Sequence, residues 1–162
     1  MAARYAAGTE VPIDRSRTEI ESTLRRYGAT GYAYGWEGDP AVVGFVVRGW
    51  QVRFELPVPT PDEERFRLTP TGKKRTASAA KAEHETAVRQ IWRVFAFMIK
   101  AMLEAVEAGL IDFEQQFLAH IVLPGGRTVG QEVGEKVAEA CQTGQVPELL
   151  PTYQHAITVG RS

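Results

Sequence analysis

The residues best suited to chemistry in this sequence are cations in its middle third. Lys73, Lys74 and Arg75 lie in a segment rich in proline and glycine, just before a long apolar stretch. Such side chains neutralise phosphates and release counterions, which gives a salt-sensitive affinity that is independent of nucleotide sequence. The candidate phosphate-binding cations are Arg25, Arg26, Arg65, Arg67, Lys73, Lys74, Arg75 and Lys81. The alternative is a solvated loop whose charges serve solubility.

A row of aromatic residues could add stacking on nucleic-acid bases. Tyr32, Tyr34 and Trp36 alternate with Ala33 and Gly35, and in a strand this spacing directs all three rings to one face. Exposed rings contribute about 1–3 kcal/mol per stacked base in proteins that bind single strands. The alternative is that the rings pack in the core, which we expect for most of them. All three remain candidate nucleic-acid-binding residues.

Residues for catalysis or metal binding are too scattered to form a motif. His84, His120 and His155 lie far apart, and the single cysteine, Cys141, rules out a disulfide framework or a cysteine-based zinc site. Three carboxylates lie on or beside the predicted strands, but two of them flank a turn, where acidic residues serve local hydrogen bonds. These carboxylates are Glu37, Asp39 and Glu55. We therefore predict no catalytic residue, no metal, no cofactor and no enzymatic activity.

Length and composition indicate one globular domain with a divided charge. The 162 residues are 44% apolar and 24% charged, and the net charge is −1. Residues 1–100 hold 16 Lys and Arg against 12 Asp and Glu, whereas residues 101–162 hold 3 against 8. The most apolar stretch, 91–106, is shorter than the roughly 20 residues that span a bilayer. We expect no membrane association and a cytoplasmic location.

Periodicity and turn residues predict the elements that position these side chains. Ser16 and Glu19 have the spacing of a capping box, which predicts a helix over 16–27. Period-two alternation predicts three strands, and residues 57–78 read as a loop in which Phe66 and Leu68 form a short strand or anchor the chain. A long helix follows, apolar on most sides, so it is the spine of the domain or half of a subunit interface. The predicted ranges are 16–27, 32–36, 41–48, 50–56, 78–108, 112–121 and 129–142.

This order predicts an α+β fold: a short helix, a three-stranded antiparallel meander, a long central helix and two short C-terminal helices. We divide the chain into an N-terminal arm (1–14), one domain (15–145) and a C-terminal tail (146–162). The topology resembles that of double-stranded RNA-binding domains, in which basic residues open the last helix as at 73–75, although the helix here is about twice as long. It also resembles single-strand annealing proteins of the Redβ type.

Several phrases of the sequence are similar to a family of small proteins of tailed phages and prophages. They include Tyr34-Gly35-Trp36-Glu37-Gly38, the stretch 99–109, the stretch 117–124 and Pro147-Glu148-Leu149-Leu150-Pro151. The resemblance covers nearly the whole chain. It implies a phage or mobile-element context and supplies no catalytic residue, because no activity is established for the family.

These observations lead to two hypotheses of function. The first is a phage-encoded accessory protein of DNA replication or recombination that binds nucleic acid, single-stranded DNA above all. It requires the cations at 25–26 and 65–81 to share one solvent-facing side. The second is a protein-interaction module or inhibitor that docks on a host or phage enzyme through its acidic C-terminal half, or on another copy of itself through the long helix.

Overall fold

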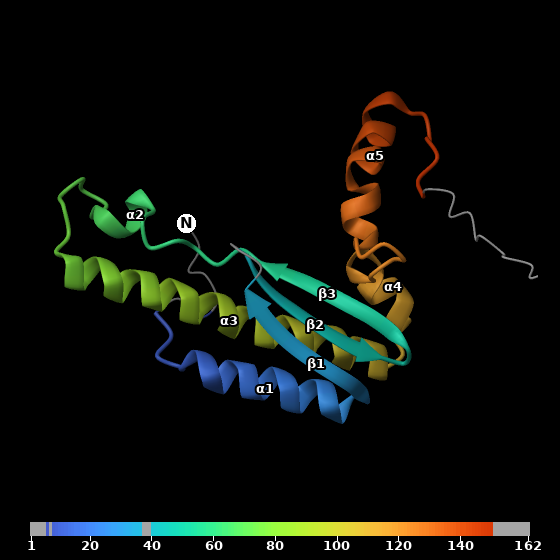
Figure 1. Cartoon of the computed structure of the whole chain (residues 1–162), viewed down its shortest axis with the longest axis horizontal. Helices are drawn as coiled ribbons and strands as arrows, with labels where there is room; N and C mark the ends of the chain where they lie inside the picture. Colours follow the sequence, from blue (N-terminus) through green and yellow to red (C-terminus); the bar gives the residue numbers. More distant parts are fainter. Residues whose placement is uncertain (1–5, 7, 37–39, 151–162) are drawn as a thin grey trace, which may run out of the picture.

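The computed structural model describes residue 6, residues 8–36 and residues 40–150. A three-stranded sheet carries two helices, α1 (Ile13–Arg26) and α3 (Ala77–Glu107), which lie side by side on one of its faces (Figure 1). A short helix precedes α3, and the remaining elements follow α3 at the opposite end of the molecule (Figure 1). This arrangement confirms the predicted α+β fold and the predicted order of its elements. None of the helices within the described residues combines the length and the apolar character needed to cross a bilayer.

Helix α1 (Ile13–Arg26) begins earlier than the sequence pattern predicts. Its N-cap is Pro12, and no side chain caps it, so the predicted capping box of Ser16 and Glu19 is wrong. Ser16 is instead a fully buried residue inside the helix. Proline is tolerated at a helix start because its missing N–H has no partner there in any case, which lets the helix begin three residues before Ser16.

The sheet consists of β1 (Ala29–Trp36), β2 (Ala41–Val47) and β3 (Trp50–Leu56), paired antiparallel in that order. The three predicted strands and their meander are confirmed. Arg48 and Gly49 both adopt positive φ, as the tight hairpin between β2 and β3 requires. The predicted turn at 37–39 lies outside the described residues.

The loop after β3 contains the short helix α2 (Glu64–Arg67). Phe66 is buried and stacks edge-on against His84 of the long helix, at 5.3 Å between ring centroids. Of the two alternatives for this region, Phe66 therefore anchors the loop. Leu68 makes one isolated β-bridge with Lys74, which closes the segment into a compact turn.

Helix α3 (Ala77–Glu107) is the spine of the domain. The Thr76 side chain caps it by accepting a hydrogen bond from the Ala79 N–H. Its buried residues face both the sheet and α1, and they include Trp92, Phe95, Ile99 and Leu103. Arg93 pairs with Glu19 of α1, so the two helices are joined by charge as well as by apolar packing.

The C-terminal elements extend from the end of α3. They are α4 (Phe113–Phe117), a 3-10 turn η1 (Leu118–His120) and α5 (Val129–Thr143). The single helix predicted over 112–121 is thus divided in two, and Asp112 makes no side-chain cap. Backbone bonds tie the next residues to the edge of β3, with the Val122 N–H donating to the Gln51 carbonyl at 2.8 Å.

Residues 121–150 form what we call the C-terminal arm. Helix α5 stands away from the sheet and from α3 (Figure 1). Thr128 and Gln131 make a reciprocal capping box at its start, and no residue of the helix is buried. The chain then turns back beside α5, where the Lys136 amine donates to the Glu148 and Leu149 carbonyls at 3.0 and 3.2 Å. The arm is therefore well formed locally, and beyond its base at Ile121 and Thr128 the described chain leaves α5 without a buried residue.

We expect Gly130→Ala to destabilise the base of the arm. A Cβ at Gly130 would lie 2.8 Å from the Ala119 carbonyl oxygen, so α5 would have to move away from η1. Overpacking of this kind costs about 1–3 kcal/mol. Urea unfolding followed by circular dichroism measures the loss.

The matched control is Gly134→Ala, one turn further along, where a Cβ meets nothing within 4 Å. It is expected to stabilise the helix by about 0.5–1 kcal/mol. Equal effects of both substitutions would contradict the close contact.

Candidate functional site

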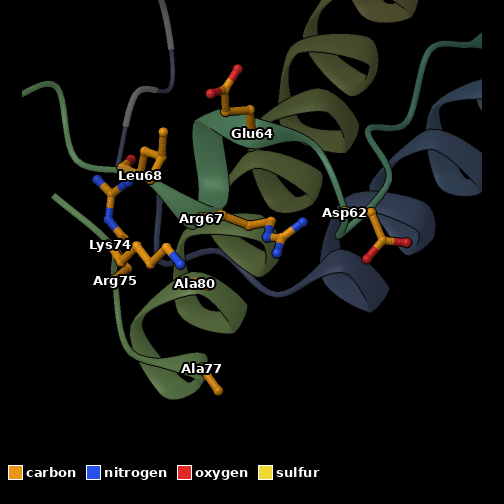
Figure 2. Close-up of a pocket in the computed structure, with 8 residues that line it drawn as sticks. All are labelled: Asp62, Glu64, Arg67, Leu68, Lys74, Arg75, Ala77 and Ala80. Atoms are coloured by element: carbon orange, nitrogen blue, oxygen red, sulfur yellow. Dashed lines mark hydrogen bonds between the residues drawn. The ribbon is translucent and has the colours of Figure 1, made fainter. Parts of the chain in front are cut away.

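The basic segment, residues 65–81, lies around the start of α3. It encloses a hollow of about 600 Å³ between α2, the 68–75 turn and the first turns of α3. Figure 2 shows the Arg67 and Asp62 side chains extending into the same space, while Arg75 turns back toward Leu68. The hollow is lined by Asp62, Glu64, Arg67, Leu68, Lys74, Arg75, Ala77 and Ala80.

Half of the cations in this segment are already paired. Arg65 lies 2.7 Å from the Glu63 carboxylate and covers the ring of Phe66. Arg75 donates to the backbone carbonyls of Arg65 and Leu68 and pairs with Glu83 at 3.6 Å. Its guanidinium therefore holds the turn together and is largely withdrawn from solvent.

Lys81 pairs with Glu85 at 3.9 Å. The other three cations of the basic segment, Arg67, Lys73 and Lys74, have no salt bridge to any described residue, and all three are exposed.

The two arginines of α1 lie at the opposite end of the molecule. Arg25 pairs with Glu21 at 2.6 Å, and Arg26 pairs with Glu104 near the end of α3 at 3.3 Å. Glu104 follows Lys81 by 23 residues of helix, which is about 35 Å at 1.5 Å per residue. The expectation that 25–26 and 65–81 share one surface is therefore wrong.

Tyr32 and Tyr34 of β1 lie toward the helices. Tyr34 pairs in register with Val43 of the core face and lies edge-on to Trp92, 6.2 Å between ring centroids. The Arg17 guanidinium lies 4.4 Å from the Tyr34 ring and 4.5 Å from the Trp92 ring. Tyr34 keeps 49% of its surface exposed, but Arg17 covers one face of its ring.

The rings of Tyr32 and Tyr34 therefore do not form the open row that stacking on bases would require. Tyr32 is half-buried and packs against the core. The Trp36 side chain lies outside the part of the chain that the structure describes.

Burial raises the pKa of Tyr32 to about 12, and its hydroxyl is buried with no hydrogen-bond partner among the described residues. The folded state thus holds the proton more tightly than the unfolded chain, whose tyrosine pKa is about 10. Stability linked to this group is complete below pH 10 and is lost as the pH rises from 10 to 12. We expect Tyr32→Phe to flatten that alkaline loss, by about 1 kcal/mol after allowance for solvent screening. Urea midpoints of both proteins between pH 8 and 12 measure it, and parallel curves would contradict it.

A third surface is an apolar groove between α3 and the end of β3, on the helix that the sequence offers as the spine of the domain or as half of a subunit interface. It measures about 650 Å³, and its exposed α3 residues include Val94 and Met98, 39% and 37% exposed. His120 closes one end, stacked on Phe54 at 3.9 Å between ring centroids, and burial lowers the pKa of His120. The groove is lined by Phe54, Glu55, Leu56, Pro57, Arg65, Ala87, Gln90, Ile91, Val94, Phe95, Met98 and His120.

The sequence does hold a signal for this groove. Apolar residues recur along one flank of α3 at alternating spacings of four and three, beside the core-facing stripe. This is the spacing of a helix-pairing seam. The seam comprises Ala87, Ile91, Val94, Met98, Ala101, Ala105 and Ala108.

The C-terminal arm offers a complementary surface. Glu132, Glu135 and Glu139 lie on α5 against the single cation Lys136. Glu132 pairs with Arg127, whereas Glu135 and Glu139 have no salt bridge to any described residue. The arm also exposes three large apolar side chains, Val137, Val146 and Leu150.

The base of the arm is fixed to β3 by polar contacts. The Arg53 guanidinium donates to the Gln131 side-chain oxygen at 2.8 Å, and the Gln131 amide donates to Glu55. Glu55, considered above as a strand carboxylate, thus has a structural partner. Glu37 and Asp39 lie outside the described residues.

Two of the residues considered above for catalysis or metal binding remain, one with a structural contact and one without. His84 lies 2.9 Å from the Pro59 carbonyl, and Cys141 is exposed on α5. Within residues 8–36 and 40–150 no three metal-ligating side chains come close enough to hold an ion. Comparison with known proteins gives no match: no family model, curated protein or solved structure is similar to the chain.

Proposed function

We propose that this chain is a protein-interaction module that docks on a partner through its C-terminal arm. The observation that carries the proposal is α5, a 15-residue helix with apolar and acidic sides and no buried residue. A helix of this length is marginal in water unless it packs on something. In the described structure its contacts are with η1, the preceding segment 121–128, the returning segment 144–150 and the edge of β3.

The partner best suited to this arm has an apolar groove with basic residues at its rim. Exposed Val137, Val146 and Leu150 supply apolar contact, and Glu135 and Glu139 select for positive charge. The resemblance to phage proteins favours a phage or host enzyme as that partner. Binding of this kind uses helix-in-groove recognition, in which side chains one or two turns apart anchor the helix.

The test compares what the full chain captures from a bacterial lysate with and without an intact arm. Val137→Glu combined with Val146→Glu alters two exposed side chains of the arm. The matched control is Leu110→Glu, which alters an exposed side chain just after α3. We expect a partner that binds the unaltered chain and the control at least tenfold more than the arm variant. Identical capture by all three proteins would overturn the proposal.

Nucleic-acid binding is a second candidate, supported by Arg67, Lys73 and Lys74, whose charges no described carboxylate neutralises. Three phosphate contacts predict weak binding to single strands, with a slope of log K against log salt near −2. Fluorescence anisotropy with labelled single-stranded DNA, duplex DNA and duplex RNA tests it. Lys73→Glu with Lys74→Glu should abolish binding, and Arg25→Glu with Arg26→Glu should leave it unchanged. Undetectable binding at low salt rules this candidate out.

A further inference from the structure

We infer that the apolar groove beside α3 receives the C-terminal arm of a second copy of this chain, so that two copies exchange arms. The inference rests on the proposed docking role of the arm and takes a second copy of this chain, in place of a phage or host enzyme, as its partner. The groove and the arm are separate unoccupied surfaces of the same described chain, one concave and one projecting.

Charge is the first argument for a second copy. The groove lining itself holds one cation, Arg65, and one carboxylate, Glu55. The cations without a salt bridge, Arg67, Lys73 and Lys74, lie outside the lining, in the basic segment around the start of α3. Residues 62–81 hold six cations against three carboxylates, whereas α5 holds three glutamates against one lysine. Opposite potentials on two surfaces favour their association and fix its direction.

Dimensions are the second argument. The α3 part of the groove extends from Ala87 to Met98, about 16 Å of helix. The 15 residues of α5 measure about 22 Å, so the helix can fill the groove along its whole length. The floor of the groove is formed by Leu56, Ile91, Val94 and Met98, which would cover exposed valines of the arm.

The arm of the same chain is held away from its own groove. The capping box at Thr128, the Val122 bond to Gln51 and the Gln131 contacts with Arg53 and Glu55 fix the start of α5. Laying α5 into the groove of its own chain would break these bonds, whereas a second copy brings its arm with them intact. In a reciprocal exchange each copy contributes one arm and one groove, which doubles the buried surface and closes the assembly.

The test is sedimentation of the full chain between about 1 and 200 μM, with a Kd on the order of micromolar expected for so small an interface. The groove variant combines Val94→Glu with Met98→Glu, and the arm variant combines Val137→Glu with Val146→Glu. All four side chains are exposed, so the fold should persist. Each variant alone should be monomeric. An equal mixture should form heterodimers more weakly than the unaltered chain forms dimers, because only one intact arm meets one intact groove.

Leu110→Glu is the control and should dimerise as the unaltered chain does. Hydrogen exchange of the unaltered chain at rising concentration gives a second measurement that needs no variant, with protection expected at 87–98 and 129–140. A chain that is monomeric at 200 μM overturns the inference. So does a dimer lost in the groove variant and kept in the arm variant, which would indicate pairing of two α3 seams. A monomer that still captures a partner through Val137 and Val146 overturns this inference alone and leaves the proposed function standing.

Discussion

Trp92→Ala is expected to lower the free energy of unfolding by about 3–5 kcal/mol. Trp92 is 1% exposed and lies where α3, α1 and β1 meet. It packs edge-on against Phe95 and Tyr34 and holds the Arg17 guanidinium over its ring. Truncation leaves a cavity and also removes the surface on which Arg17 rests. A typical domain has only 5–15 kcal/mol of stability, so the variant should be close to unfolding.

Urea unfolding followed by circular dichroism measures this loss without relying on tryptophan fluorescence. Val94→Ala, two residues further along α3 and 39% exposed, is the matched control and should cost less than about 1 kcal/mol. Trp92→Phe gives an intermediate point, because it keeps a ring and removes an indole N–H that has no hydrogen-bond partner among the described residues. A loss below 1 kcal/mol for Trp92→Ala would contradict this view of the core.

The elements that could be predicted from sequence are those set by local patterns. Alternation in Trp50–Leu56 and the Arg48-Gly49 turn specify a hairpin, and the apolar periodicity of α3 specifies its length to within a residue or two. The start of α1 could not be predicted in this way. From the sequence, Ser16 could equally be a helix cap or a small buried residue. Only the packing of α1 on α3 decides between the two.

The candidate site was less predictable because it depends on contacts between residues far apart in sequence. The partner of Arg26 is Glu104, 78 residues away, and no local pattern indicates that pair. The sequence also predicts the long α3. That length separates the cations at 25–26 from those at 65–81 only because α1 ends beside the last turns of α3, where Arg26 pairs with Glu104. Pairs of opposite charge close in the sequence, such as Arg65 with Glu63, can be predicted. They lower the number of cations in the basic segment that are free to bind phosphates.

The apolar groove also depends on contacts that the sequence does not specify. The sequence predicts a helix that is apolar on most sides, either the spine of the domain or half of a subunit interface. The sheet covers the stripe that contains Trp92 and Ile99, and α1 covers the side that contains Arg93. The flank with Val94 and Met98 is left exposed because the chain supplies no third layer within its described residues.

Phe117→Ala is expected to cost about 3–5 kcal/mol as well, and to release the C-terminal arm before the rest of the domain unfolds. Phe117 is fully buried and lies against Phe113, Phe45 and Phe54, at 4.6, 5.9 and 6.4 Å between ring centroids. It is the contact through which α4 holds the arm to the sheet.

Hydrogen exchange distinguishes release of the arm from global unfolding, because segments with few buried contacts open separately from the core. In Phe117→Ala the amides of residues 121–143 should exchange faster by at least tenfold relative to those of 92–103. Leu118→Ala, the neighbouring residue at 55% exposure, should leave both segments unchanged. Equal acceleration of both segments would mean that arm and core open as one unit. Faster exchange in the arm alone would show that the packing of Phe117 is needed to hold the arm on the sheet, in addition to its polar contacts with β3.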